Sequence, residues 1–345
     1  MTWSWGQGGL TRVAPPRYTQ NVSDTGSAQE DLRSLECFHQ VYFRTSKGGL
    51  GVEYDNARAE FAAVFAPSEV RILRDRPSRC RLSVELRITE EALAARAVRL
   101  GYTLGIVRVT RHPVEGRAPG GTPQMRGRWP IGWLREGNSE LLFEPVFVAS
   151  EAQRMAESPH VFAFPQTRNG RVLAASRGHR VNRRLSPLDA RFVANICGLP
   201  DGARVLDPFA GLCVLADALA RRGLRTTVAD ADPGLRIGLE QHHPGSAVIA
   251  DARALPYAHG AFDGIVTEPP YHPADQPAVV DSMAELSRVV VPGGRLALFI
   301  ADFMLPDLEF VWSTLGLREW SRYPVRRHGI HSVCVVLSNG EGAPP

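Results

Sequence analysis

The stretch Val205-Leu206-Asp207-Pro208-Phe209-Ala210-Gly211 has the pattern of a buried strand that runs into a tight turn. Asp207 stands where the strand ends, and Gly211 precedes an apolar segment, residues 214–221, with helical spacing. In doubly wound sheets, ligands bind at the carboxyl ends of the strands, and small residues in this turn let a ligand approach the backbone. The stretch therefore predicts a Rossmann-like α/β domain whose cofactor site includes Asp207, Pro208, Phe209, Ala210 and Gly211.

The residues around this stretch continue the same pattern. Ser186 and Pro187 predict the start of a helix over 188–197, and Gly198 stands where its C-terminal cap is expected. Short apolar runs then alternate with helical segments, and these runs lie at 204–206, 226–229, 247–250, 264–267 and 296–300. Such alternation indicates a parallel sheet with helices on both faces. Residues 319–325 and 332–337 are expected to close the domain as a hairpin.

Acidic residues also follow the second and third expected strands. Asp230-Ala231-Asp232 comes about twenty residues after the turn, where a carboxylate accepts hydrogen bonds from ribose hydroxyls. Asp251-Ala252 is suitably placed for the edge of an adenine. A nicotinamide or flavin cofactor is an alternative, but the turn lacks the three glycines that hold a pyrophosphate. A further alternative is that Asp207 only caps the helix that follows.

A second motif, Glu268-Pro269-Pro270-Tyr271, follows the fourth expected strand. The prolines fix the backbone of the turn, so that one carbonyl can face outward beside the Glu268 carboxylate. An exocyclic NH2 group that donates to both acceptors is oriented with its nitrogen lone pair toward a methyl donor. Tyr271 is expected to stack on the ring that bears the amine. A surface turn is the simpler alternative for a Pro-Pro-Tyr sequence.

The two motifs resemble the DPFxG and [D/N]PPY motifs of S-adenosylmethionine-dependent amino-group methyltransferases. Within that group, residues 184–195, 264–267 and 291–296 are most similar to the family that N2-methylates guanine in tRNA. The resemblance implies S-adenosylmethionine as the cofactor, a seven-stranded Rossmann-like methyltransferase domain, and tRNA as the nucleic-acid partner. It also implies that Glu268 and the Pro269 carbonyl orient the amine, with Pro270 and Tyr271 completing the catalytic motif.

The N-terminal half predicts a separate α+β domain. Residues 38–43, 81–86 and 103–109 have strand patterns, 54–65 and 89–98 have helical spacing, and 112–128 reads as a Pro- and Gly-rich loop. An apolar segment at 139–147 and a helix at 150–157 are expected next. Residues 54–65 and 81–108 resemble the ferredoxin-like domain that precedes the catalytic domain in the tRNA methyltransferases. We therefore expect a disordered tail at 1–32, a ferredoxin-like substrate- or RNA-binding domain at 33–160, and the methyltransferase domain at 161–340.

Composition excludes several classes of protein. No run of eighteen apolar residues occurs, so a soluble, cytoplasmic protein without a membrane partner is expected. The five cysteines are far apart and lack a nearby histidine cluster, which favours reduced thiols over a zinc site, and no metal is expected. Almost all of the 40 basic residues are arginine, which is typical of GC-rich codon usage. Only the basic cluster at 168–191 stands out, as either a solvated linker or a phosphate-contacting surface.

Other functions stay open at this point. A DNA or small-molecule amine methyltransferase would need the same motifs. A non-catalytic RNA-binding protein with a degenerate methyltransferase fold is the second class, because Leu212-Cys213 and Glu268 depart from the residues usual in the family. A small partner subunit could supply part of the grip on RNA.

Overall fold

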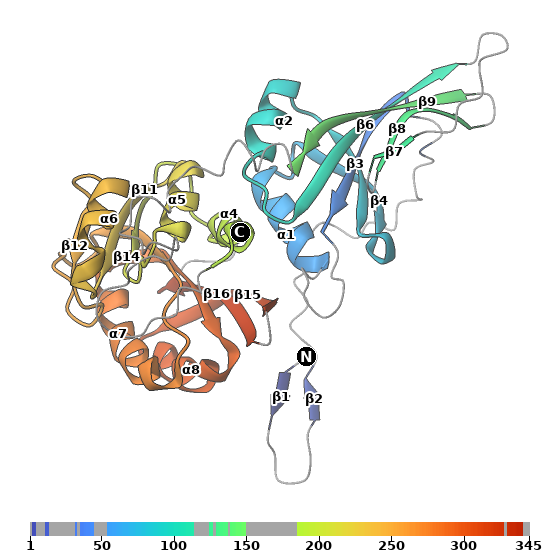
Figure 1. Ribbon diagram of the computed structural model, residues 1–345. Coiled ribbons are helices and arrows are strands. Elements are labelled where there is room, and N and C mark those ends of the chain that lie inside the picture. Colours follow the sequence, from blue (N-terminus) through green and yellow to red (C-terminus); the bar gives the residue numbers. More distant parts are fainter. Residues whose placement is uncertain are drawn as a thin grey trace, which may run out of the picture.

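The computed structural model of the 345-residue chain describes residues 2–4, 11–13, 32, 35–44, 54–113, 124–126, 129–136, 139–149, 185–327 and 330–340. The helix expected at 150–157, the domain boundary near 160 and the basic residues from 168 to 184 lie outside the described residues. A mixed α/β domain and a β-rich domain lie side by side (Figure 1).

The C-terminal domain is built on a seven-stranded sheet of order β12-β11-β10-β13-β14-β16-β15. Its strands are β10 (Arg204–Asp207), β11 (Arg225–Asp230), β12 (Ala247–Ile249), β13 (Phe262–Thr267), β14 (Val290–Ala301), β15 (Leu317–Arg327) and β16 (Ile330–Asn339). Strands β10 to β14 pair in parallel, whereas β16 runs antiparallel to both β14 and β15. The predicted parallel sheet and closing hairpin are therefore confirmed, and the turn at 328–329 lies outside the described residues.

Among the described residues, this domain has α4 (Pro187–Ile196), which precedes β10, and four α-helices that each connect two strands: α5 (Val214–Arg221), α6 (Arg236–His242), α7 (Gln276–Val289) and α8 (Leu305–Thr314). The sequence explains where α4 starts. The Ser186 hydroxyl accepts a hydrogen bond from the Asp189 N–H (3.1 Å), and Pro187 has no N–H that would need an acceptor in the first turn. Gly198, just beyond the helix, has φ +72°, as its expected role at the C-terminal cap requires.

The strand order reverses at the centre of the sheet. From β10 the chain continues through β11 and β12 on one side, and then through β13 and β14 on the other side. Ligands of open α/β sheets bind where the strand order reverses in this way, at the carboxyl ends of the strands. That place lies here between the ends of β10 and β13, at Asp207 and Thr267.

The N-terminal domain has a second seven-stranded sheet, of order β4-β5-β3-β6-β9-β8-β7 with antiparallel pairings throughout. Its elements are β3 (Cys37–Phe43), α1 (Tyr54–Val64), β4 (Val70–Arg76), β5 (Arg81–Leu86), α2 (Glu90–Ala97), β6 (Thr103–Pro113), β7 (Gln124–Arg126), β8 (Trp129–Glu136) and β9 (Ser139–Val148). The chain order β3-α1-β4-β5-α2-β6 with β3 and β5 in the middle of β4-β5-β3-β6 is the ferredoxin-like arrangement. The expected fold class is confirmed.

Three segments of this half differ from the sequence-based expectation. Strand β4 was not expected, because its sequence VRILRDR carries three arginines and lacks an apolar alternation. The loop expected at 112–128 is wrong in part, since β6 extends to Pro113 and β7 pairs with β8. Strand pairing satisfies the backbone groups there despite the nearby prolines and glycines. Finally, β1 (Thr2–Ser4) and β2 (Thr11–Val13) pair within the expected disordered tail, whose remaining residues up to 31 lie outside the described residues.

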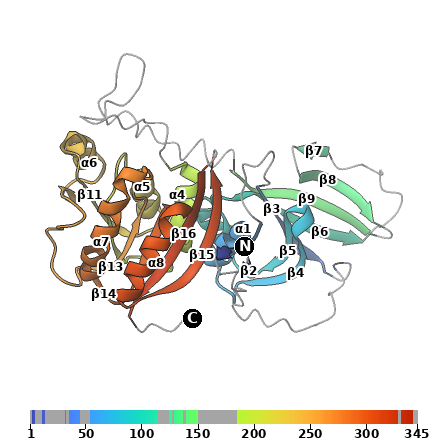
Figure 2. The same cartoon turned by 90° about the horizontal axis from the view of Figure 1, so that it is seen from below.

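The two domains share a continuous apolar core. The ring of Tyr102, from the start of β6, stacks on Phe192 of α4 with a centroid distance of 4.6 Å and an interplanar angle of 18°. Phe192 in turn meets Tyr323 of β15 edge to face at 5.5 Å. Figure 2 shows the β15–β16 hairpin on the side of the C-terminal domain that faces α1, and the Asn56 side chain of α1 donates to the Pro324 carbonyl (2.7 Å).

A buried carboxylate ties these elements together. Glu60 of α1 is fully buried and accepts hydrogen bonds from the Gly101 N–H (2.7 Å), the Tyr102 N–H (2.8 Å) and the Asn195 side chain of α4 (2.9 Å). Burial raises the pKa of Glu60 to about 7, although these donors favour its charged form. A single carboxylate thus joins α1, the start of β6 and α4.

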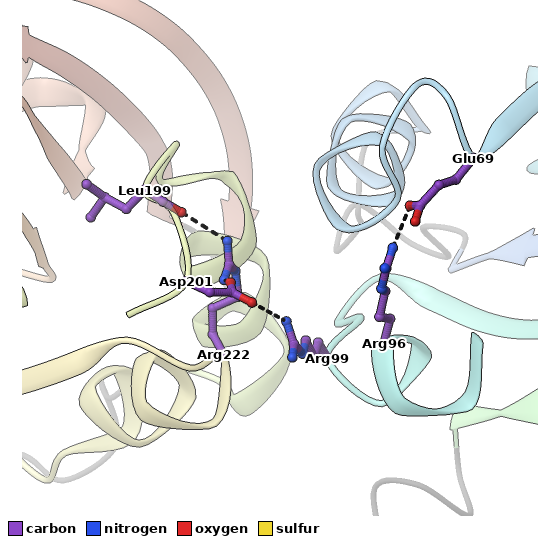
Figure 3. A network of polar contacts seen from close by, with 6 residues as sticks. All are labelled: Glu69, Arg96, Arg99, Leu199, Asp201 and Arg222. Carbon is purple, nitrogen blue, oxygen red and sulfur yellow. Dashed lines mark hydrogen bonds and ion pairs between the residues drawn. The ribbon is translucent and has the colours of Figure 1, made fainter. Parts of the chain in front are cut away.

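Ion pairs border this junction (Figure 3). Asp201, which follows α4, pairs with Arg99 (3.7 Å) beyond the end of α2 and with Arg222, and Arg222 also donates to the Leu199 carbonyl (3.0 Å). On the other side, Arg96 of α2 pairs with Glu69. Asp201 is 64% exposed, so these pairs add little to stability, and the buried Glu60 cluster holds the junction. Among the described residues, no helix has the length and apolar character needed to cross a membrane.

Candidate functional site

The site begins with two side chains that meet across adjacent parallel strands. Asp207 ends β10, Thr267 ends β13, and the Thr267 hydroxyl donates a 2.6 Å hydrogen bond to the Asp207 carboxylate. The Phe209 N–H also points to this carboxylate (3.3 Å). Asp207 is 1% exposed and Thr267 is fully buried, so this contact lies buried at the point where the strand order reverses.

Two further carboxyl groups lie near the contact between Asp207 and Thr267. Burial raises the pKa of Asp207 to about 7, and the neighbouring carboxylates of Asp230 and Glu268 act in the same direction. These three residues come from the ends of β10, β11 and β13, so the sheet topology brings together acidic residues that are far apart in the sequence. Such a cluster favours a cationic ligand and disfavours an anionic one.

The turn after β10 is held in an open shape. Gly211 has φ +49°, and its N–H donates to the Asp230 carboxylate (2.8 Å), which also accepts from the Asp232 N–H (2.9 Å). Among the described residues, no atom lies within 4 Å of the position that a Cβ would take at Gly211. Cys213, two residues after Gly211, has φ +61°, which is uncommon for a residue with a side chain.

The alternative that Asp207 caps the following helix is wrong. Helix α5 begins after Cys213, whose side chain makes no capping hydrogen bond. Asp207 instead accepts hydrogen bonds from the Thr267 hydroxyl and the Phe209 N–H, neither of which belongs to α5.

The remaining predicted cofactor residues lie along the same edge. Pro208 and Ala210 are buried, Phe209 is half-buried, and Ala231 is exposed directly after β11. Asp251, after β12, forms a two-point ion pair with Arg253 (2.6 and 3.0 Å), which lowers the pKa of its carboxyl group. Ala252 beside it is buried. A role of Asp251 toward an adenine therefore stays a prediction, and it would require the carboxylate to turn from Arg253.

The second motif, residues 268–271, directly follows Thr267. One carboxylate oxygen of Glu268 accepts a hydrogen bond from the Tyr271 hydroxyl, and the other accepts from the Leu185 N–H (3.0 Å) just before α4. Pro269 is buried and Pro270 is half-buried between them. The Glu268 side chain is thus held on both sides and stays partly exposed.

Tyr271 is covered more than the sequence suggests. Its residue is only 8% exposed, and it belongs to the apolar core that includes Phe299 and Leu185. The hydroxyl holds Glu268 and lies 3.5 Å from the Phe299 carbonyl. Stacking of a base on Tyr271 stays a prediction, whereas its contact with Glu268 is part of the structure.

Three contributors were not found from the sequence. Thr267 reads as the last residue of an apolar strand, and only the pairing of β10 with β13 shows that its hydroxyl reaches Asp207. The Leu185 N–H comes from a backbone group that no side-chain pattern reveals. The left-handed Cys213 could have been suspected, because it stands where the related motif has a glycine.

His272, His242 and His243 contact neighbouring residues of their own domain. His272 follows Tyr271, but it is exposed, and its ring accepts from the Ala274 N–H (3.2 Å) at the start of a short 3-10 turn. His242 and His243 both lie 3.6 Å from Asp217 on α5. No group of three potential metal ligands occurs among the described residues.

The site's residues fit a sulfonium cofactor better than a dinucleotide. S-adenosylmethionine carries positive charge on its sulfonium and amino groups and has no phosphate, so the acidic cluster suits it. A pyrophosphate would meet Asp207, Asp230 and Glu268 without the glycine cradle that usually binds it. Asp207, the open turn at Gly211 and the Asp230 carboxylate are the groups that would hold S-adenosylmethionine.

Comparisons with known proteins agree with this fold. Residues 206–298 match the family model described as "Methyltransferase domain". The demethylmenaquinone methyltransferase of Renibacterium salmoninarum is 32% identical over 117 residues, which is 34% of this chain and 48% of that protein. The ubiquinone biosynthesis O-methyltransferase of Xylella fastidiosa is 34% identical over 139 residues, or 38% of this chain and 54% of that protein. The chain thus spans about half the length of these relatives.

Among solved structures, TrmN from Thermus thermophilus aligns with 88% of this chain and 99% of its own, at 16% identity and a TM-score of 0.49. A methyltransferase from Burkholderia thailandensis, solved with S-adenosylhomocysteine, aligns with 44% of this chain and 78% of its own, at 18% identity and a TM-score of 0.37. The strand order and the family match together show that the C-terminal half has the α/β fold of a methyltransferase domain, whose cofactor is S-adenosylmethionine.

Proposed function

We propose that the protein transfers a methyl group to an exocyclic amino group, and that the group is the N2 amine of a guanine in tRNA. The observation that carries the proposal is the position of Glu268 and Pro269 at the end of β13, directly beside Asp207. A carboxylate and a carbonyl at this place are acceptors for the two hydrogens of an NH2 group. The resemblance of the motif to guanine-N2 methyltransferases of tRNA supports the choice of substrate.

The chemistry follows from what each group can bind. S-adenosylmethionine supplies an electrophilic methyl group, and Asp207 and Asp230 lie where its positive charge would be bound. Glu268 and the Pro269 carbonyl would accept hydrogen bonds from the amine and fix its lone pair along the line of attack. As the nitrogen gains the methyl group it becomes positively charged, and the Glu268 carboxylate stabilises that charge. The surplus proton then leaves to Glu268 or to water.

A direct assay tests the proposal. The full-length protein is incubated with methyl-labelled S-adenosylmethionine and unmodified tRNA, and the nucleosides are separated by mass spectrometry. We expect new N2-methylguanosine with the wild type and at least a hundredfold less with Glu268→Ala, because one of the two acceptors is lost. Asp281→Ala, at an exposed position on α7, is the matched control and should keep full activity. A wild type that binds cofactor but forms no methylated guanosine contradicts the substrate.

A second candidate is a small-molecule methyltransferase. It is favoured by the curated relatives, which are named as quinone-biosynthesis methyltransferases and are 32% and 34% identical over part of the catalytic half. The same labelled cofactor, incubated with an organic extract and with DNA in parallel, separates these substrates from tRNA. A third candidate is a degenerate non-catalytic protein, and it is favoured if calorimetry detects no cofactor binding to either the wild type or Asp207→Ala.

A further inference from the structure

The hairpin formed by β4 and β5 carries an unusual excess of positive charge. Residues 70–87 contain six arginines and only two acidic residues, Asp75 and Glu85. The hairpin stands at one edge of the ferredoxin-like sheet, because β4 is the outermost strand and pairs only with β5 among the described strands. None of the residues of the candidate site described above belongs to it.

Both acidic residues of the hairpin already have partners. One carboxylate oxygen of Glu85 accepts from two nitrogens of Arg71 (2.5 and 2.6 Å), and the other lies 3.5 Å from Arg87. Asp75 accepts a hydrogen bond from the Tyr54 hydroxyl (2.5 Å) and lies 3.5 Å from Arg58 of α1. Four arginines are left without an ion pair to any carboxylate of the described residues: Arg74, Arg76, Arg79 and Arg81.

Backbone pairing forces these four arginines, which we call the arginine hairpin, close together. Arg76 and Arg81 are direct partners in the antiparallel register of β4 and β5. Like charges opposite each other in a sheet are destabilising. Desolvation and the neighbouring charges of Arg74, Arg81 and Arg79 also lower the pKa of Arg76. The fold therefore keeps a repulsive arrangement that a polyanion would relieve.

The turn between β4 and β5 is short and closed by a backbone hydrogen bond. Pro77 to Arg79 form a 3-10 turn, closed by the Cys80 N–H donating to the Pro77 carbonyl (3.0 Å). Cys80 has φ +48°, a strained conformation for a residue with a side chain. Arg81 is further held by the Gln40 side chain (3.3 Å) and by the ring of Tyr42, whose centroid lies 5.9 Å from its guanidinium carbon. Its guanidinium group is thus fixed before any ligand arrives.

We propose that the arginine hairpin binds the phosphodiester backbone of a nucleic acid. Guanidinium groups match phosphate oxygens in two-point geometry, and several of them on one hairpin can contact successive phosphates. An anionic membrane is less well matched, because Ile72 is the one exposed large apolar side chain described within the hairpin. The inference rests on the proposed function for the view that this nucleic acid is the substrate, and it gives the ferredoxin-like domain a definite role in holding it.

The test compares three variants of the full-length protein. The first is Arg74→Gln/Arg76→Gln/Arg79→Gln, and the matched control is Arg221→Gln/Arg225→Gln/Arg236→Gln, at three exposed arginines of the C-terminal domain. Arg76→Lys is the third, because it keeps the charge and loses the planar fork. Binding to labelled tRNA and to duplex DNA is measured by fluorescence anisotropy at salt concentrations from about 50 to about 200 mM. Over this range the affinity of a protein that makes many phosphate contacts falls by about a thousandfold or more.

We expect the hairpin variant to bind RNA at least tenfold more weakly at low salt than the wild type, with a salt slope shallower by about two to three. The control should keep both values, and Arg76→Lys should keep the salt slope while losing affinity. Melting temperature and cofactor affinity, measured alongside, should be unchanged or raised in the hairpin variant, because the repulsion between Arg76 and Arg81 is relieved. This result would separate loss of binding from loss of folding.

Other outcomes overturn one proposal or the other. Unchanged RNA affinity and salt slope in the hairpin variant, with intact methyl transfer, would overturn the inference and leave the proposed function standing. Hairpin-dependent binding to RNA or DNA without any methyl transfer would support the inference and overturn the proposed function. Hairpin-dependent binding to phosphatidylserine vesicles, without affinity for either nucleic acid, would overturn the inference in favour of a membrane surface.

Discussion

The hydroxyl group of Thr267 donates a 2.6 Å hydrogen bond to the Asp207 carboxylate, and so joins the end of β13 to the end of β10. Through this contact the cofactor turn and the Glu268 motif share one buried anchor, because Thr267 directly precedes Glu268. The two motifs are sixty residues apart in sequence, and the parallel pairing of their strands brings them together.

Replacing Thr267 by valine keeps the shape of the side chain and removes its donor. Asp207 then loses its shortest hydrogen bond while still buried, so Thr267→Val should lower the free energy of unfolding by about 1–3 kcal/mol and weaken cofactor binding several-fold. Thr267→Ser keeps the hydroxyl and is the matched control. Urea denaturation and calorimetric titration with cofactor measure both effects. Equal cofactor affinity in the valine and serine variants would show that Asp207 does not depend on this contact.

Tyr271 offers a way to separate two roles of one residue. If its hydroxyl positions Glu268, Tyr271→Phe should lower kcat for tRNA methylation about tenfold or more, because a hydrogen bond to a charged group is lost. The KM for cofactor should change little. If the ring only stacks on the base, the phenylalanine variant should keep the wild-type rate. Tyr257→Phe, at a half-buried tyrosine that packs edge to face on Phe262, is the control and should be neutral.

Much of this site could be predicted from sequence, because short motifs of neighbouring residues mark the ends of its strands. The sequence Asp207 to Gly211 and the dipeptide Pro269-Pro270 are short-range signals, and their strands lie where the apolar runs predict them. Polar contacts between distant strands leave no such signal, so Thr267 was overlooked. Leu185 contributes only a backbone N–H, which every residue type except proline would supply.

The edge of the N-terminal sheet was harder to predict for a different physical reason. An edge strand such as β4 needs only one apolar face and tolerates charged residues along its exposed side, so its sequence lacks the alternation of a central strand. Strand β7 likewise pairs with β8, and β8 pairs with β9, so each depends on a strand further along the chain. The central strands β3, β5 and β6 carry the apolar pattern and could be found without the structure.

The buried Glu60 should make stability depend on pH in a defined direction. Its pKa is raised to about 7 in the folded protein, against an ordinary value of 4.5, so the folded state holds a proton that the unfolded state has released between these two values. The stabilisation is therefore complete below about pH 4.5 and is lost as the pH rises through 7. Asp207, whose pKa is also raised to about 7, contributes in the same sense.

Glu60→Gln tests this linkage. The amide has one acceptor oxygen where the carboxyl group has two, so the donors from Gly101, Tyr102 and Asn195 cannot all be satisfied. We expect a loss of about 1–3 kcal/mol in the free energy of unfolding at pH 5, and a smaller difference from wild type at pH 8. Glu91→Gln, at an exposed position on α2, is the control. A difference that grows with pH would contradict the raised pKa.

Gly101 lies so close to α4 that a larger residue at this position should destabilise the protein. A Cβ at this position would lie 2.2 Å from the Leu188 carbonyl oxygen and 3.3 Å from the Cβ of Arg191. Backbone atoms inside a helix cannot move aside like the end of a side chain, so Gly101→Ala must push α4 away from the N-terminal domain. We expect the free energy of unfolding to fall by about 1–3 kcal/mol. Because α4 follows Leu185, whose N–H holds Glu268, methyl transfer should fall as well. Ala95→Ser, which adds one atom at an exposed position on α2, should change neither quantity. A Gly101→Ala variant that unfolds like the wild type would mean that the two domains do not pack through this glycine in solution.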